Sequence, residues 1–182
     1  SFNFHIIFVI VNWKAQEIPS REAISSIMKS LNIGEELAIL LIQRGIEDFD
    51  TAKKFFRPRI EDLHDPFLMK DMEKAIIRIE EALANNHKIM IYGDYDVDGT
   101  TAVSLVYQFF SQHSSNIIYY IPDRYKEGYG VSFQGIDYAA QNGVSLIIAL
   151  DCGIKSNYHV EYAAAKKVDF IICDHHLPGE KI

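Results

Sequence analysis

The chain has 182 residues, of which 48% are hydrophobic, and this suits one domain of ordinary size with a smaller appendage. Its formal net charge of −7 argues against a protein whose whole surface binds polyanions, although it leaves room for a local basic patch. Its two cysteines, Cys152 and Cys173, each end an apolar run. We expect both to be buried thiols in a reducing compartment, which favours the cytoplasm.

The amino-terminal run SFNFHIIFVIVNWK is apolar, but it has neither a basic segment nor a small-residue cleavage site. It is also far shorter than the roughly 20 apolar residues that a membrane-spanning helix needs. We interpret it as a strand or as non-native sequence, and we expect no membrane partner.

The first third of the chain is predicted to be a small helical lead-in, over residues 1–68. Apolar residues recur there at helical spacing, with Gly45 placed as a stop signal. The expected helices are 21–31, 35–44 and 51–56. A longer amphipathic helix should follow, with Asp71 as its N-cap, and end near Asn85.

From Lys88 onward, short apolar runs alternate with helical segments. The runs have the length and β-branched content of buried strands, and the segments between them suit crossover helices. The expected strands are KIMIYG (88–93), NIIYYI (116–121), SLIIAL (145–150) and DFIIC (169–173). This pattern predicts an α/β fold with a parallel sheet, over residues 69–182.

Acidic and imidazole side chains follow three of these strands. They are Asp94, Asp96 and Asp98 after the first strand, Asp151 after the third, and Asp174, His175 and His176 after the fourth. The carboxyl ends of parallel strands share one edge of a sheet, where ligands bind in open α/β folds. Carboxylates gathered there repel one another unless cations intervene. The pattern therefore predicts a metal site.

The string DYDVDGT alone is compatible with three chemistries. A calcium loop would need an acidic ligand at its twelfth position, where this chain has Leu105. A haloacid-dehalogenase-type phosphatase would use Asp96 as nucleophile and Asp98 as acid or base, but it has no use for the CDHH cluster. A two-metal phosphoesterase would use every cluster, because mixed carboxylate and imidazole ligands suit Mn²⁺ or Mg²⁺.

Three motifs, GDYDVDG, LDCGI and CDHH, resemble those of the DHH phosphoesterase family. The chain is also similar to the RecJ-like branch of single-strand-specific DNA exonucleases in FFRPRIEDLHDPFLMKDMEKA, PDRYKEGYG and DHHLPGE. This resemblance covers the chain from about Asp50 to its end. It implies metal-dependent hydrolysis of single-stranded DNA in the 5′ to 3′ direction, in repair and recombination.

The resemblance also implies roles for single residues and for metal ions. It implies that the metal ligands are Asp96, Asp98, Asp151 and His175, with Asp151 bridging two Mn²⁺ or Mg²⁺ ions. It also implies that three catalytic residues support these ligands: Asp94, Asp174 and His176. Each aspartate has a plainer interpretation as a turn residue or helix N-cap, and the histidine pair as part of an ordinary surface loop.

Candidate contacts with nucleic acid are fewer. Arg124 is the candidate for a phosphate contact, and an ion pair with Glu127 is an equally simple alternative. In AKKFFRPRI, basic residues alternate with Phe55 and Phe56 in a composition suited to phosphate contact and base stacking. We expect these two aromatic rings to face the core of the helical region instead.

Two departures from the family pattern limit the resemblance. Tyr92 stands where many members have a histidine, and the further aspartate ligand and second domain of the family do not follow. We therefore expect the phosphoesterase domain to be incomplete at its C-terminal end, and the isolated chain to be weak or inactive. Other DHH-type substrates stay open (an oligoribonucleotide, a cyclic dinucleotide or pyrophosphate), and so does a non-catalytic nucleic-acid-binding module.

Overall fold

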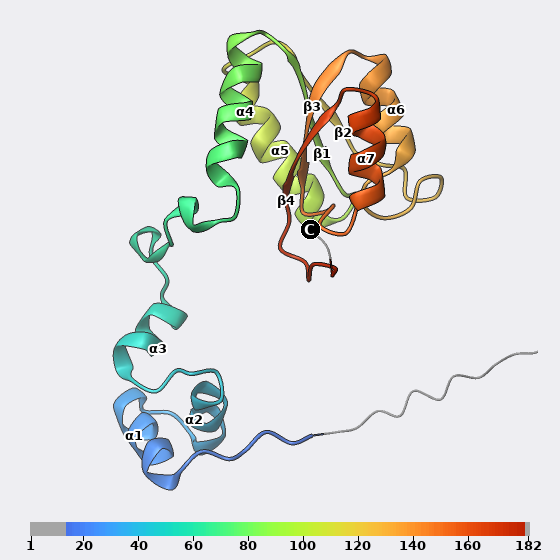
Figure 1. Ribbon diagram of the computed structural model, residues 1–182. Coiled ribbons are helices and arrows are strands. Elements are labelled where there is room, and N and C mark those ends of the chain that lie inside the picture. The colour runs from blue at the N-terminus through green and yellow to red at the C-terminus, as the bar shows by residue number, and fades with distance from the viewer. Residues whose placement is uncertain (1–13, 181–182) are drawn as a thin grey trace, which may run out of the picture. The chain divides into compact units, whose positions relative to one another are not determined.

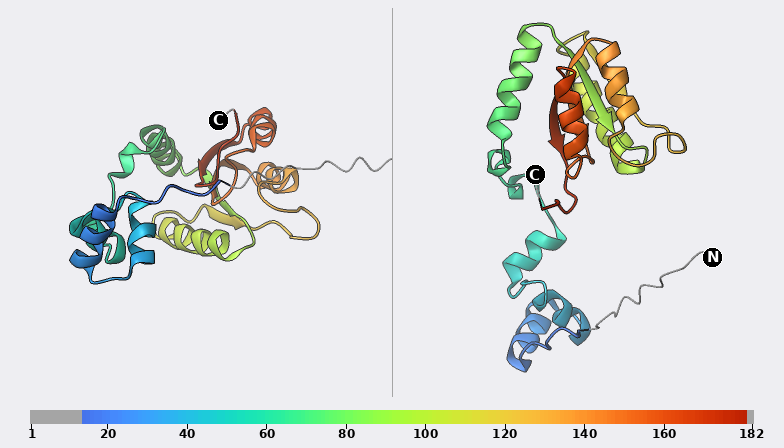
Figure 2. Two further views of the ribbon diagram at one scale, coloured as in Figure 1. Left: turned by 90° about the horizontal axis from the view of Figure 1, so that it is seen from below. Right: turned by 45° about the vertical axis from the view of Figure 1, so that its right-hand side comes forward.

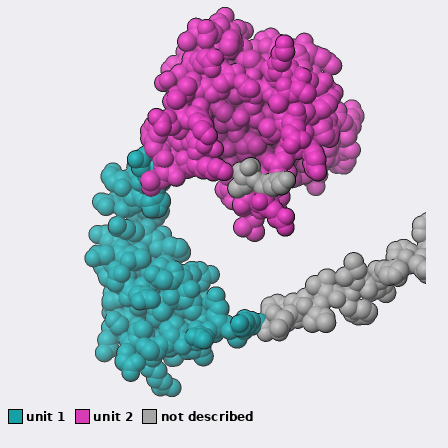
Figure 3. All heavy atoms as spheres, viewed as in Figure 1, with its two compact units in different colours: residues 1–65 teal, residues 66–182 magenta. Residues whose placement is uncertain are grey.

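The computed structural model describes residues 14–180, so that most of the amino-terminal apolar run lies outside the described residues. The chain divides into two compact units, residues 1–65 and 66–182, and each is described by itself (Figure 3).

The first unit is helical, as predicted. It contains α1 (Arg21–Leu31), α2 (Glu35–Ile42) and α3 (Phe49–Phe56). The side chain of Ser20 caps α1 by accepting a hydrogen bond from the N–H of Ala23, and Asp48 caps α3 in the same way through Thr51. The apolar residues that face inward form a small core: Ile24, Ile27, Ala38, Leu41, Ile46 and Ala52.

The prediction that Phe55 and Phe56 face this core is wrong. Their residues are 56% and 55% exposed, and the two rings pack edge to face with their centroids 5.1 Å apart. Ala52 is the buried residue of α3. The last turn of α3 extends away from α1 and α2 (Figure 1), and Phe56 lines an open surface hollow with Leu31 and Ile33 instead of entering the core.

Two short 3₁₀ turns, Ile60–Asp62 and Pro66–Leu68, precede α4 (Met72–Ala84). Asp71 stands at the N-cap position of α4, as expected, but its side chain does not cap the helix. Asp71 has a left-handed backbone with φ 58°, and its carboxylate bonds Lys74 at 2.8 Å. That hydrogen bond lowers the pKa of Asp71.

The second unit is built on a parallel sheet, which confirms the predicted α/β class. Its strands are β1 (Lys88–Gly93), β2 (Ile117–Tyr120), β3 (Val144–Leu150) and β4 (Asp169–Cys173). They lie in the order β2-β1-β3-β4, and every neighbouring pair is parallel. The chain leaves β1 toward one edge and later returns to β3 on the other side of β1. The topological switch point therefore lies between β1 and β3.

Helices cover both faces of the sheet (Figure 1, Figure 2). The helices α4 and α5 (Val97–Ser111) pack on one face, where Val103 and Phe110 meet Ile89 and Ile91. On the other face, α6 (Phe133–Gln141) and α7 (Asn157–Ala165) contribute Ile136, Ala139 and Ala163 to a second core. Strands buried on both faces explain the continuous apolar runs of the sequence.

Cys152 is buried, as expected, whereas Cys173 is exposed at the end of the edge strand β4, and both are free thiols. Among residues 14–180, no helix is long and apolar enough to cross a membrane.

Candidate metal centre

The ends of three adjacent strands place the predicted site residues side by side. Gly93, the last residue of β1, pairs in register with Leu150, the last residue of β3. Leu150 pairs in turn with Cys173, the last residue of β4. Asp94, Asp151 and Asp174 are each the next residue of their chain segment. The sheet register therefore aligns the three acidic clusters at the switch-point edge.

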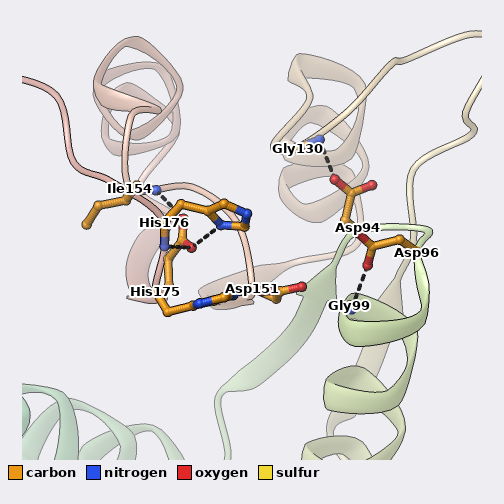
Figure 4. Close-up of polar contacts among 9 residues, drawn as sticks. Asp94, Asp96, Gly99, Gly130, Asp151, Ile154, His175 and His176 are labelled. Atoms are coloured by element: carbon orange, nitrogen blue, oxygen red, sulfur yellow. Dashed lines mark hydrogen bonds and ion pairs between the residues drawn. The ribbon is translucent and has the colours of Figure 1, made fainter. Parts of the chain in front are cut away.

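The closest group of ligand donors comes from β3 and β4. Asp151, His175 and His176 each offer one ligand atom, and these atoms all lie within 4.8 Å of one another. Nε2 of His175 lies 2.9 Å from Oδ1 of Asp151 (Figure 4). The Asp151 side chain is 11% exposed, whereas that of His175 is 77% exposed. Solvent therefore reaches the group from the histidine side.

Asp174 organises this group. Its Oδ2 accepts the N–H of Ile154 at 2.9 Å, and its Oδ1 accepts the N–H of His176 at 3.0 Å. The same Oδ1 lies 2.7 Å from Nδ1 of His176. Burial opposes ionisation of Asp174, but these hydrogen bonds outweigh it and hold its pKa below the usual value. With Nδ1 engaged, Nε2 of His176 is left for a ligand, in the manner of metal-binding histidines.

Asp151 has a left-handed backbone, with φ 58°. Its N–H donates to the carbonyl of Cys173 at 2.8 Å, which extends the β3–β4 pairing by one residue. A residue with a side chain rarely adopts this conformation, and such strain concentrates at functional sites. The conformation aims the carboxylate at the crevice between β1 and β4 (Figure 4).

On the β1 side, Asp94 is wholly buried and binds backbone. Its Oδ1 accepts the N–H of Tyr95 at 2.7 Å, and its Oδ2 accepts the N–H of Gly130 at 2.9 Å. Burial raises the pKa of Asp94 against these hydrogen bonds, and the negative charges of Asp96 and Asp151 raise it further.

Asp96 is the N-cap of α5, where its Oδ1 accepts the N–H of Gly99 at 2.9 Å. Asp98 lies in the first turn of the same helix and is exposed, and its side chain makes no hydrogen bond or ion pair within residues 14–180. A Cβ on Gly99 would lie 2.5 Å from the carbonyl oxygen of Asp94. Glycine therefore lets the start of α5, which carries Asp96 and Asp98, approach the end of β1 closely.

The three strand ends share one electrostatic environment. The hydrogen bond that His176 donates to the Asp174 carboxylate raises the pKa of His176, and the charges of Asp151 and Asp96 add to this effect. Asp94, Asp96 and Asp151 likewise add to the burial that raises the pKa of Tyr129. Carboxylate and imidazole donors in such a negative crevice fit a divalent cation of the Mn²⁺ or Mg²⁺ type.

Arg124 does not form the simple ion pair with Glu127. Its guanidinium carbon lies 5.4 Å from the ring centroid of Tyr95, which follows Asp94. The carboxylate of Glu127 accepts hydrogen bonds from Tyr120, Ser132 and the backbone of Asp123 instead. The guanidinium is thus exposed beside the β1 end of the site.

Sequence reasoning overlooked the residues that hold Asp94 in place. They are Tyr92, Glu127, Gly130 and Ser132, which form a hydrogen-bonded network behind the β1 side. The sequence does carry a signal: Tyr92 stands at an inward position of a buried strand, so its hydroxyl needs partners. The identity of those partners depends on a loop 38 residues away.

Residues 88–182, half of the chain, match the family model described as the DHH family, N-terminal domain. The chain belongs to the DHH family. It is 38% identical, over 172 residues, to the single-stranded-DNA-specific exonuclease RecJ of Bacillus subtilis. That alignment covers 94% of this chain and 22% of the relative, so the chain spans about a fifth of the relative's length.

Solved structures show the same DHH fold. The crystal structure of an exonuclease RecJ bound to manganese is 30% identical with a TM-score of 0.57, over 62% of this chain and 29% of that one. RecJ of Thermus thermophilus, in complex with Mn²⁺, is 24% identical with a TM-score of 0.64, over 91% of this chain and 22% of that one. The parallel sheet and its helices are therefore those of the family.

Proposed function

We propose that the chain carries the metal-binding part of a RecJ-like phosphodiesterase, which hydrolyses single-stranded DNA in the 5′ to 3′ direction. The observation that carries this proposal is the donor group of Asp151, His175 and His176, oriented by Asp174 at the switch-point edge of a DHH sheet. The name of the Bacillus subtilis relative, a single-stranded-DNA-specific exonuclease, supports the substrate. Cytoplasmic repair and recombination are the proposed setting.

The proposed ions are Mn²⁺ or Mg²⁺, and the solved RecJ structures with these ions support that choice. The proposed ligands are Asp96, Asp98, Asp151 and His175, with Nε2 of His176 as a further donor beside them. When bound, such a pair of ions activates water and stabilises the charge that develops on the phosphoryl group.

The residues of the chain have separate tasks in this proposal. Asp174 holds the His176 ring in one orientation, which removes the rotational freedom that a free imidazole would lose on binding. Asp94 fixes the β1 end through the backbone of Tyr95 and Gly130. Arg124, exposed beside Tyr95, contacts a phosphate of the DNA backbone.

The test is hydrolysis of 5′-labelled single-stranded and duplex DNA by the full-length gene product with Mn²⁺. We expect mononucleotides to be released from the 5′ end of single strands, with at least about a hundredfold loss in Asp151→Asn. Asparagine keeps the shape of the side chain and tolerates the left-handed backbone at this position. Glu161→Gln, an exposed position in α7, is the matched control.

Preferential hydrolysis of a cyclic dinucleotide, a short oligoribonucleotide or pyrophosphate would replace the DNA substrate and keep the metal site. Hydrolysis that is independent of divalent cations would contradict the proposed chemistry altogether.

A further inference from the structure

The carboxylate of Glu127 is the centre of a hydrogen-bonded network beside the β1 end. Its Oε1 accepts the N–H of Asp123 at 2.8 Å, and its Oε2 accepts the hydroxyl of Tyr120 at 2.9 Å. The hydroxyl of Ser132 also donates to Oε2. Three donors from one loop and its flanking strand thus meet on one half-buried carboxylate.

Tyr92 continues the network inside the fold. Its buried hydroxyl donates to the carbonyl of Gly130 at 2.9 Å and accepts the N–H of Ser132 at 3.1 Å. The ring stacks on Tyr120, with centroids 5.6 Å apart. A Cβ on Gly135 would lie 2.8 Å from the Tyr92 ring, so α6 leaves room for this side chain only because it has a glycine there.

The network ends on Asp94. Gly130, at φ 86°, donates its N–H to Oδ2 of Asp94 at 2.9 Å, while its carbonyl is held by Tyr92. One peptide segment thus connects the Tyr92 hydroxyl to the buried carboxylate. The same loop carries Arg124 and Tyr129, and the ring of Tyr129 packs edge to face on Tyr95.

We propose that Tyr92 and Glu127 are positioning residues that hold the loop of residues 123–132 on Asp94, and thereby fix the β1 half of the metal site and the place of Arg124. The proposal deepens the proposed function and rests on it. The Tyr92 hydroxyl bonds the backbone of Gly130 and Ser132, which assigns it to the support of the loop and not to the proposed ligand set.

The physical reason lies in the burial of Asp94. A fully buried carboxylate keeps its orientation only while donors satisfy its oxygens. One donor is the adjacent N–H of Tyr95, and the other comes from a loop whose glycines make it intrinsically free to move. Hydrogen bonds of Glu127 and Tyr92 with residues before and after Gly130 restrict this motion of the loop.

Tyr92→Phe and Glu127→Gln test the proposal in the 182-residue chain. The first readout is amide hydrogen exchange of Gly130, which needs no metal. We expect exchange to be about tenfold faster in both variants, because the N–H loses its fixed acceptor geometry. The second readout is Mn²⁺ affinity by calorimetry, which should fall about tenfold, the usual effect of losing an outer partner of a metal site.

Two matched controls separate positioning from general stability. Tyr162→Phe removes a hydroxyl that donates to Asp137 at 2.8 Å on the same face of the sheet, in a contact between α7 and α6 that does not involve residues 123–132. Glu161→Gln makes the same charge change as Glu127→Gln at an exposed site. Both controls should leave Gly130 exchange and Mn²⁺ affinity unchanged.

In the full-length gene product, Tyr92→Phe and Glu127→Gln should lower kcat about tenfold and raise the KM for single-stranded DNA, because Arg124 shifts with the loop. Exchange and affinity equal to those of the controls would overturn the positioning role while leaving the metal site intact. A wild-type chain that binds no Mn²⁺ would instead overturn the proposed function, and the exchange of Gly130 would still report on the network.

Discussion

At the end of β1, the carboxylates of Asp94 and Asp96 accept hydrogen bonds from the protein backbone, whereas at the ends of β3 and β4 a carboxylate and two imidazoles face one another. Asp94 is wholly buried, and His175 is largely exposed. The β3–β4 side thus presents its donors close together in the folded chain. The β1 side instead places Asp96 at the N-cap of α5 and Asp98 in its first turn, outside that close group of donors.

This difference separates two ways of preparing a metal site. Asp174 prepares the β3–β4 side with local contacts, all within neighbouring strand ends. The β1 side depends on the close approach of Gly99 in the next helix, and also on a more distant segment, the loop held by Tyr92. Most substitutions on the β1 side should therefore lower both the free energy of unfolding and the affinity for Mn²⁺. Substitutions that change only one of the two quantities have to be chosen deliberately.

The largest effect on the β1 side is expected from Gly99→Ala. The added Cβ would lie 2.5 Å from the carbonyl oxygen and 2.7 Å from the nitrogen of Asp94, so the backbone itself must move. We expect the free energy of unfolding to fall by about 3 kcal/mol, measured by urea denaturation.

Thr101→Ala, an exposed position in the same helix, is the control, and its effect should stay within about 0.5 kcal/mol. Equal stability of the two variants would show that the strand end and α5 are not closely packed.

A smaller effect distinguishes the two tasks of Asp96. Asp96→Ala removes both the N-cap and the carboxylate, and should cost about 1 kcal/mol of stability. Asp96→Ser keeps a capping oxygen, so it should remain close to the wild type in urea denaturation.

Both Asp96 variants should lose Mn²⁺ affinity to the same extent, because neither has a carboxylate. Full Mn²⁺ affinity in Asp96→Ser would show that Asp96 is only a helix cap, the plainer of its two interpretations.

Apolar patterning predicted most of the second unit. The runs at 88–93 and 169–173 became strands with those bounds, because residues buried on both faces leave a continuous apolar signal. The convergence of Asp94, Asp151 and Asp174 at one edge followed from parallel strands alone.

The remainder depended on tertiary contacts that local patterns do not contain. Phe55 and Phe56 have core-like spacing, but both residues are more than half exposed. An ion pair of Glu127 with Arg124 was the alternative to a phosphate contact, but Glu127 binds Tyr120 and Ser132. The sequence alone cannot predict which partner a side chain contacts, because several partners of similar chemistry lie within reach of each side chain.

The central claim is that the strand ends form a divalent-metal site, and calorimetric titration of the 182-residue chain with Mn²⁺ tests it most directly. We expect wild-type binding to weaken in Asp151→Asn by more than the roughly 10–100-fold that loss of an outer partner costs. Asp50→Asn, an exposed aspartate of α3, should bind as the wild type does. Equal Mn²⁺ affinity in wild type and Asp151→Asn would contradict the account.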